Sequence, residues 1–210
     1  MAYSKFTLDK VMQQFEVRVT EDPQIFANVE DCHPTEYLKA TLEKPTSFNL
    51  KSEKARSEKI IAPIIDDIFT TIPNKFAIFS GENFDVDKHQ SLSGLADYLI
   101  CVTESRVVIH APVIAIAESK RNDPSDGLGQ CIAELIASAI FNEQRKSQVP
   151  KLFGIMTNGN QWLMGIYIIA EKHFIYDPTL YSIRELPRII GILSFMRDEA
   201  LRMYDKKQLN

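Results

Sequence analysis

The sequence predicts an α/β protein in which helices cover a mixed β-sheet. Segments with apolar residues at helical spacing alternate with short segments rich in Val, Ile and Phe, and this alternation is typical of a sheet flanked by helices. The pair Asn158-Gly159 stands between two apolar segments and is a strong hairpin signal, so part of the sheet is expected to be antiparallel. The expected order is a helix, three strands, a helix, two strands and a closing helix.

The chain is long enough for one well-buried core, because it has 210 residues of which 45% are hydrophobic. We expect one main domain over residues 51–210 and an N-terminal extension, residues 1–50, that packs on it. Prolines punctuate this extension, which is predicted to hold two short helices. These helices are expected over residues 7–15, capped by Thr7, and 34–42, with Pro34 in the first turn.

The main domain is predicted to begin with a helix over residues 52–69. Ser52 can cap this helix, and five isoleucines form one apolar stripe at helical spacing. Pro63 interrupts the stripe and predicts a kink or a break. The three strands that follow are expected over residues 76–84, 95–103 and 107–119, with a turn at residues 104–106.

The third strand contains Pro112, which demands a bulge or a bend because proline cannot donate to a strand ladder. Loop residues at 122–127 precede a nearly apolar stretch that is expected to form a largely buried helix. The remaining elements are expected as a helix at 128–144, strands at 151–156 and 161–170, a short strand piece at 174–176, and a helix at 184–201.

Composition limits the setting of the protein. No segment reaches the roughly 18 uninterrupted apolar residues that a membrane helix needs, and the N-terminus lacks the pattern of a secretion signal. The three cysteines, Cys32, Cys101 and Cys131, are widely spaced and form neither a metal-ligand pattern nor a disulfide framework. These observations predict a cytoplasmic protein that does not associate with membranes.

The net charge of −4 does not by itself point to nucleic acid, since strongly basic chains are the ones that do. Local charge matters more than the total, because salt screens exposed charges beyond about 8–10 Å. Basic residues cluster at Lys51-Lys54-Arg56-Lys59, at Lys120-Arg121 and at Arg145-Lys146-Lys151. Each cluster is explained equally well as an ordinary solvated surface.

The candidate site consists of charged residues at strand ends. Glu118 and Lys120 end a strand rich in Val and Ile and are two residues apart, so both side chains point to the same face. Asp97 lies at the start of the preceding strand. If these strands pair antiparallel, Asp97 and Glu118 come together at one end of the hairpin. The sequence therefore predicts two carboxylates and one ammonium group in close proximity.

Such a cluster suits a hard cation that keeps part of its water shell, such as Mg²⁺. A bound metal ion lowers the pKa of a water molecule and neutralises charge on a phosphate, and a lysine can stabilise the charge that develops during attack. The alternative is a salt bridge at a strand end, because a Glu-x-Lys triplet is common in proteins.

The order Asp97, then Glu118-Ser119-Lys120, then Gln130 on the next helix resembles the PD-(D/E)XK nuclease superfamily. The chain looks most similar to the N-terminal nuclease domain of type I restriction enzymes and to small stand-alone relatives. The early helix glutamate of that family is best matched by Glu58, with Glu53 as the alternative. The stretch Thr157-Asn158-Gly159 followed by Trp162 resembles a further motif of the family. The resemblance implies a restriction-endonuclease-like sheet and covers about residues 53–170.

The resemblance also implies roles for these residues. Asp97 and Glu118 would bind Mg²⁺ or Mn²⁺ directly, and Glu58 would hold a water of the metal ion. Lys120 would position and activate the attacking water. Gln130 would orient the site or contact the phosphate; the alternative for Gln130 is a polar residue at a helix start, and for Glu58 an exposed residue paired with a lysine.

Two functions follow as hypotheses. The first is a metal-dependent nuclease that hydrolyses the phosphodiester bonds of nucleic acid, acting as a DNA endonuclease. The second is a nucleic-acid-binding or assembly module that has this fold but no turnover, since a fold does not by itself confer an activity. Cutting both strands of a duplex usually needs two active sites, which makes a homodimer a reasonable expectation. The helix at 128–144 and the C-terminal helix are candidate surfaces for it, although both are better explained as core.

Overall fold

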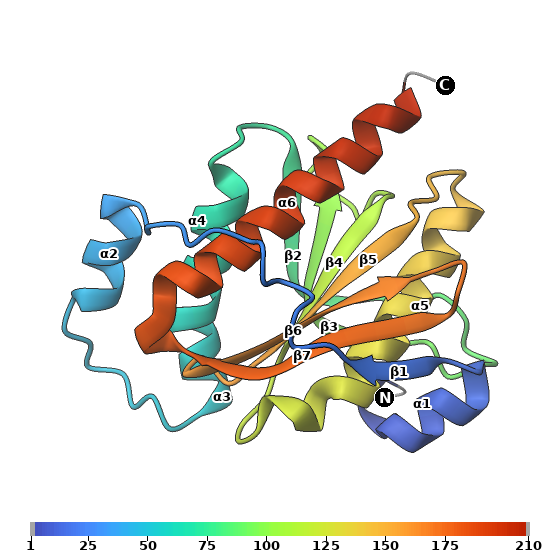
Figure 1. Cartoon of the computed structure of the whole chain (residues 1–210), viewed down its shortest axis with the longest axis horizontal. Coiled ribbons are helices and arrows are strands. Elements are labelled where there is room, and N and C mark those ends of the chain that lie inside the picture. Colours follow the sequence, from blue (N-terminus) through green and yellow to red (C-terminus); the bar gives the residue numbers. More distant parts are fainter. Residues whose placement is uncertain (1–2, 209–210) are drawn as a thin grey trace.

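The computed structural model describes residues 3–208, with side chains described for residues 3–205, so the outer ends of the predicted parts 1–50 and 51–210 lie outside it. One seven-stranded mixed sheet has the order β1-β7-β6-β5-β4-β3-β2 (Figure 1). The strands are β1 (Arg18–Glu21), β2 (Phe76–Asn83), β3 (Leu95–Val102), β4 (Val113–Ser119), β5 (Lys151–Thr157), β6 (Gln161–Ile168) and β7 (His173–Ser182). The predicted α/β class is confirmed.

Helices cover both faces of this sheet (Figure 1). They are α1 (Leu8–Phe15), α2 (Glu36–Glu43), α3 (Glu53–Arg56), α4 (Ala62–Thr70), α5 (Leu128–Gln144) and α6 (Leu186–Gln208). Helices α1 and α5 share one hydrophobic core with one face of the sheet, whereas α4 and α6 share a second core with the opposite face. The helix α1 begins as predicted, because the Thr7 hydroxyl accepts a hydrogen bond from the Lys10 backbone N–H.

The topology places β4 and β5 in the middle of the sheet. Strands β2, β3 and β4 form an antiparallel meander, and α5 then connects β4 to its parallel neighbour β5. Strands β5, β6 and β7 are again antiparallel. Because helices cover both faces, every residue of β4 is buried, and this explains why the strand reads as a continuous apolar run until Glu118.

The number of strands differs from the prediction, which had five. The additional strands are β1, which pairs parallel to β7 at the edge of the sheet, and β7 itself, of which only a short piece was expected. Both strands carry a weak signal for a physical reason. Strand β1 is short, polar and mostly exposed, and β7 contains Asp177 and Pro178 within its length.

The predicted strand at residues 107–119 is wrong in its first half. Strand β4 begins only at Val113, and the preceding residues 103–112 form a loop in which Val107 is 89% exposed. Pro112 has no N–H to donate to a strand ladder. The first residue of β4 instead bonds the buried side chain of Asn142, whose Oδ1 accepts from Val113 N at 2.8 Å and whose Nδ2 donates to Val113 O at 2.7 Å.

The helix predicted at residues 52–69 is divided by a π-helical turn, Ser57–Ile61, between α3 and α4. Ser52 caps α3 as predicted, accepting from Ala55 N at 3.2 Å. Pro63 lies in the first turn of α4, where its missing N–H is tolerated, and Ala62 N–H bonds Ser57 O five residues back. The expected interruption is therefore a local change of helix type next to the candidate site.

Candidate active site

Asp97 and Glu118 face each other across the β3–β4 pair. The antiparallel register joins Tyr98 to Ala117, so the next position outward sets Asp97 opposite Glu118 on the same face of the sheet. Asp97 Oδ2 also accepts a hydrogen bond from the backbone N–H of Ser119 at 2.8 Å. The antiparallel pairing therefore brings the two carboxylates together, as the sequence predicted.

The Glu118 carboxyl group is 2% exposed and only half satisfied by hydrogen bonds. Its Oε1 accepts from Lys120 Nζ at 2.8 Å, whereas its Oε2 is buried and has no hydrogen-bond partner among the described residues 3–205. Burial first, and the negative charge of Asp97 second, raise the Glu118 pKa to about 8, against the opposing effect of Lys120. Burial also raises the pKa of Asp97.

Lys120 lies directly after β4 and is held by backbone and side chain. Its backbone N–H donates to Thr157 O at 2.7 Å, which fixes the residue beside the end of β5. Its ammonium group donates to Glu118 Oε1 and, at 2.9 Å, to Gln130 Oε1. Burial is the largest single effect and opposes the charged form, but Glu118, Asp97 and Glu134 together outweigh it and raise the Lys120 pKa above its ordinary value.

Gln130 lies in the first turn of α5, with its side chain turned toward the strand ends. Its carbonyl oxygen accepts from Lys120, and its Nε2 donates to Glu134 Oε1 at 3.1 Å. Glu134 is fully buried and was not predicted as a site residue. An acidic residue inside an almost apolar helix, one turn after Gln130, is the sequence signal that could have identified it.

The two candidates for the helix carboxylate occupy different positions. Glu58 is exposed and forms an ion pair with Lys54 Nζ at 4.0 Å. Glu53 lies close enough to Glu118 for its negative charge to raise the Glu118 pKa. The electrostatic coupling therefore favours Glu53, which was the alternative, over Glu58. A water-mediated role for Glu58 stays a prediction.

Arg56 builds the frame around the site and was not predicted to do so. Its guanidinium group is buried and donates five hydrogen bonds, all of them to backbone carbonyl groups. The acceptors are the carbonyl oxygens of Leu50, Lys51, Lys120, Arg121 and Asn158. One side chain thus ties the end of the N-terminal segment, the residues after β4 and the β5–β6 turn together.

The motif Thr157-Asn158-Gly159 forms that β5–β6 turn. Asn158 Oδ1 accepts from the backbone N–H groups of Asn160 and Gln161, while its Nδ2 donates to Asn122 O. Gly159 has a φ of +85°, and a Cβ atom there would lie 3.3 Å from Arg56 Cβ. The motif therefore supports the loop that follows Lys120 and requires glycine at its third position.

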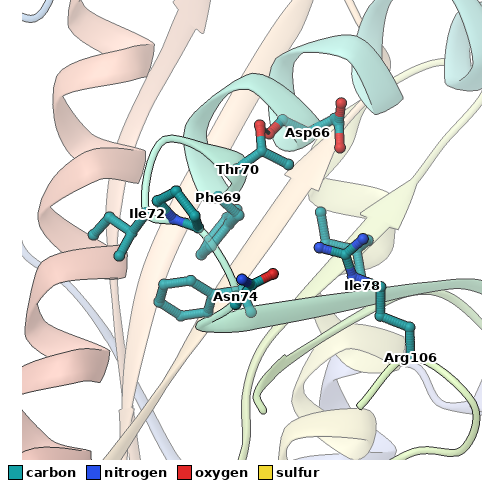
Figure 2. Close-up of a pocket in the computed structure, with 9 residues that line it drawn as sticks. Asp66, Phe69, Thr70, Ile72, Asn74, Ile78 and Arg106 are labelled. Carbon is teal, nitrogen blue, oxygen red and sulfur yellow. Dashed lines mark hydrogen bonds between the residues drawn. The ribbon is translucent and has the colours of Figure 1, made fainter. Parts of the chain in front are cut away.

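A cavity of about 550 Å³ opens beside Arg121, the residue that follows Lys120 in the chain. It is lined by Asn49, Lys51, Ser52, Glu53 and Arg121. A second pocket, of about 310 Å³, lies at the other end of β2 and β3, where Phe76 pairs with Val102 (Figure 2). Figure 2 shows Asp66 and Arg106 on opposite sides of it. None of the predicted site residues lines this second pocket.

The residues present fit a magnesium ion held mainly by water and substrate. Among residues 3–208, no group of three or more His, Cys, Asp or Glu side chains is arranged to hold a metal ion. Mg²⁺, however, is commonly bound by one or two carboxylates and keeps several waters. Asp97 and the unpartnered Oε2 of Glu118 provide such a pair, which a cation would also relieve of mutual repulsion.

The site makes a specific prediction about pH and stability. The Glu118 pKa is raised in the folded protein, so folding favours the protonated form; this stability is present below the unfolded pKa near 4.5 and is lost as the pH rises through about 8. Glu118→Gln cannot ionise. In EDTA, the variant is expected to gain stability over the parent from pH 5 to about pH 8, by up to about 1.4 kcal/mol per pH unit, and the gain should level off above pH 8.

Urea unfolding at several pH values measures this difference. The matched control is Glu143→Gln, which changes an exposed residue of α5 and is expected to leave the pH dependence unaltered. A constant difference between Glu118→Gln and the parent across this range would mean that Glu118 is ionised normally.

No protein-family model matches the chain, and no significant match was found among curated proteins or solved structures. The helices within residues 3–208 include none that combines the length and the apolar character needed to cross a membrane. What the fold and the site define is therefore a class: an α/β protein with a mixed seven-stranded sheet and a carboxylate–lysine cluster at the ends of its central strands.

Proposed function

We propose that the protein is a metal-dependent nuclease that hydrolyses phosphodiester bonds of DNA as an endonuclease. The observation that carries this proposal is the arrangement of Asp97, Glu118 and Lys120. Two carboxylates lie side by side, one of their oxygen atoms is buried without a partner, and an ammonium group is held 2.8 Å from the Glu118 carboxylate. The resemblance to PD-(D/E)XK nucleases assigns the same three residues to the reaction.

Each side chain of the site has a separate role in the proposed hydrolysis. Asp97 and Glu118 would hold Mg²⁺ or Mn²⁺, which would supply charge neutralisation at the phosphate and a water of lowered pKa. Lys120 orients the attacking water or a phosphate oxygen through an ammonium proton that its two protein partners leave available. Gln130 holds the ammonium group in place and so keeps its direction constant.

Nucleic acid is supported as the substrate by the charges next to the site. Lys51 and Arg121 are exposed, and both line the cavity of about 550 Å³ together with Glu53. Lys54 is also exposed on the adjacent helix α3. These three cations outnumber the two neighbouring carboxylates, Glu53 in the same cavity and Glu58 beside Lys54, and phosphate backbones bind to local clusters of positive charge.

The test is cleavage of plasmid and single-stranded DNA with Mg²⁺, with Mn²⁺ and with EDTA. We expect cutting that requires the metal ion, together with loss of Mn²⁺ binding in Asp97→Asn by calorimetry. Asp66→Asn, in the second pocket, is the matched control and is expected to bind and cut like the parent. Absence of cutting and of metal binding by the folded parent would contradict the nuclease.

A binding module without turnover is the second candidate, and the small number of metal-ligating side chains favours it. It would bind DNA without cutting it, and its binding would weaken as salt rises, because each phosphate contact releases counterions. A gel-shift titration at several salt concentrations distinguishes the two functions. Binding that is absent or independent of salt would contradict both.

A further inference from the structure

Glu134 is a buried acid with no part in the proposed metal site or in the proposed hydrolysis. It lies in α5, one turn after Gln130, and its side chain is fully enclosed. Its Oε1 accepts a hydrogen bond from Gln130 Nε2 at 3.1 Å, and its Oε2 has no partner among the side chains of residues 3–205. A carboxyl group in such surroundings is costly, so its retention calls for a physical reason.

The surroundings favour the neutral form of this acid. Burial first, and the negative charge of Glu118 second, hold the Glu134 pKa well above its ordinary value; Asp97 adds to this, and the hydrogen bond from Gln130 and the charge of Lys120 oppose it. The other titratable groups that it affects are Tyr3 and Cys131, neither of which carries charge at neutral pH. Glu134 is therefore placed to accept a hydrogen bond rather than to balance a positive charge.

The side chains of Lys120, Gln130 and Glu134 are hydrogen-bonded in sequence, and their donors and acceptors allow only one arrangement. The ammonium group of Lys120 can only donate, so the oxygen of the Gln130 amide must face it. The NH₂ group of that amide must then point away from Lys120, toward the next turn of α5, where it needs an acceptor. Glu134 Oε1 is that acceptor, because residues four apart on a helix lie on the same face.

We propose that Glu134 is a positioning residue that orients the Gln130 amide and thereby fixes the ammonium group of Lys120. Two of the three ammonium protons are committed, to Glu118 Oε1 and to Gln130 Oε1. Two fixed hydrogen bonds determine the direction of the third proton, which is the one available to a water or a phosphate oxygen. The consequence for hydrolysis rests on the proposed function, whereas the positioning of Lys120 does not.

Two substitutions at Glu134 separate hydrogen bonding from space filling. Glu134→Gln keeps an oxygen acceptor for Gln130 Nε2, and Glu134→Met has a similar length but only the weak acceptor of a thioether sulfur. The matched control is Ser138→Ala, which changes a buried residue one turn further along α5 that contacts Glu134 only through its backbone oxygen. Glu134→Leu serves as a second apolar variant if Glu134→Met does not fold.

The readout is hydrogen exchange of the Lys120 ammonium group, observed by ¹⁵N NMR in EDTA and assigned by its absence in Lys120→Ala. We expect Glu134→Gln and Ser138→Ala to exchange like the parent. Glu134→Met and Gln130→Ala are expected to exchange about five- to tenfold faster, as for the loss of one hydrogen bond. Unchanged exchange in folded Glu134→Met or Glu134→Leu would overturn the proposal.

Cleavage assays add a second readout if the parent cuts DNA. Glu134→Met is then expected to lower kcat with little change in KM, and Glu134→Gln to restore it, because the acceptor and not the charge is required. A parent that does not cut, but whose Lys120 exchange rises in Glu134→Met, would refute the proposed nuclease while supporting the positioning role.

Discussion

Replacing Lys120 by alanine is expected to reduce DNA cleavage by about 10²–10⁴-fold, the usual effect of removing a group that transfers protons or stabilises charge in the transition state. Lys120 donates to Glu118 and Gln130, and within residues 3–205 it is the only cation in hydrogen-bond contact with the Glu118 carboxylate. Asp97 and Glu118 remain in Lys120→Ala, so Mn²⁺ should still bind. The measurement is kcat on plasmid DNA, with metal binding followed by calorimetry.

The control for this prediction is Lys172→Ala, which removes an exposed lysine from the turn before β7, at the opposite edge of the sheet from β2. Its kcat should equal that of the parent. Cleavage by Lys120→Ala at the rate of the parent would show that Lys120 takes no part in the reaction. Loss of both metal binding and folding would assign Lys120 to stability instead.

Replacing Arg56 by methionine is expected to destabilise the protein by about 3–5 kcal/mol, since a buried charged group is removed from a network of good hydrogen bonds. Methionine fills much of the same volume but donates to none of the five carbonyl groups that Arg56 bonds. The bond to Asn158 O is buried and the other four are part-buried, so the substitution would leave carbonyl groups that water reaches only in part. The measurement is the free energy of unfolding in urea.

The matched control is Arg121→Met, because Arg121 is exposed and its side chain lines the open cavity. It should change stability by less than about 0.5 kcal/mol. Amide hydrogen exchange locates the effect. In Arg56→Met, protection should fall after β4 and in the β5–β6 turn, because Arg56 joins these two segments. Equal stability of Arg56→Met and the parent would contradict the framing role.

Much of the candidate site could be predicted because it depends on local patterns. The period of two along a strand places Glu118 and Lys120 on one face, and an antiparallel hairpin places Asp97 opposite Glu118. The hydrogen bond between Lys120 and Glu118 agrees with both predictions. The register of β3 and β4 could be predicted although the extent of the loop at residues 103–112 was predicted incorrectly. The strands on either side of the loop set the pairing.

By itself the sequence determined the fold class, most of the helices and strands, and the grouping of Asp97, Glu118 and Lys120, because these follow from periodicity and chain order; Gln130 was predicted from the family resemblance. The tertiary structure alone decided the rest. Strand β1 depends on an edge that β7 provides, and the roles of Arg56 and Glu134 depend on carbonyl and amide groups brought from distant parts of the chain. Arg56 and Glu134 have these roles because they are buried, and burial depends on the assembled fold rather than on the local sequence.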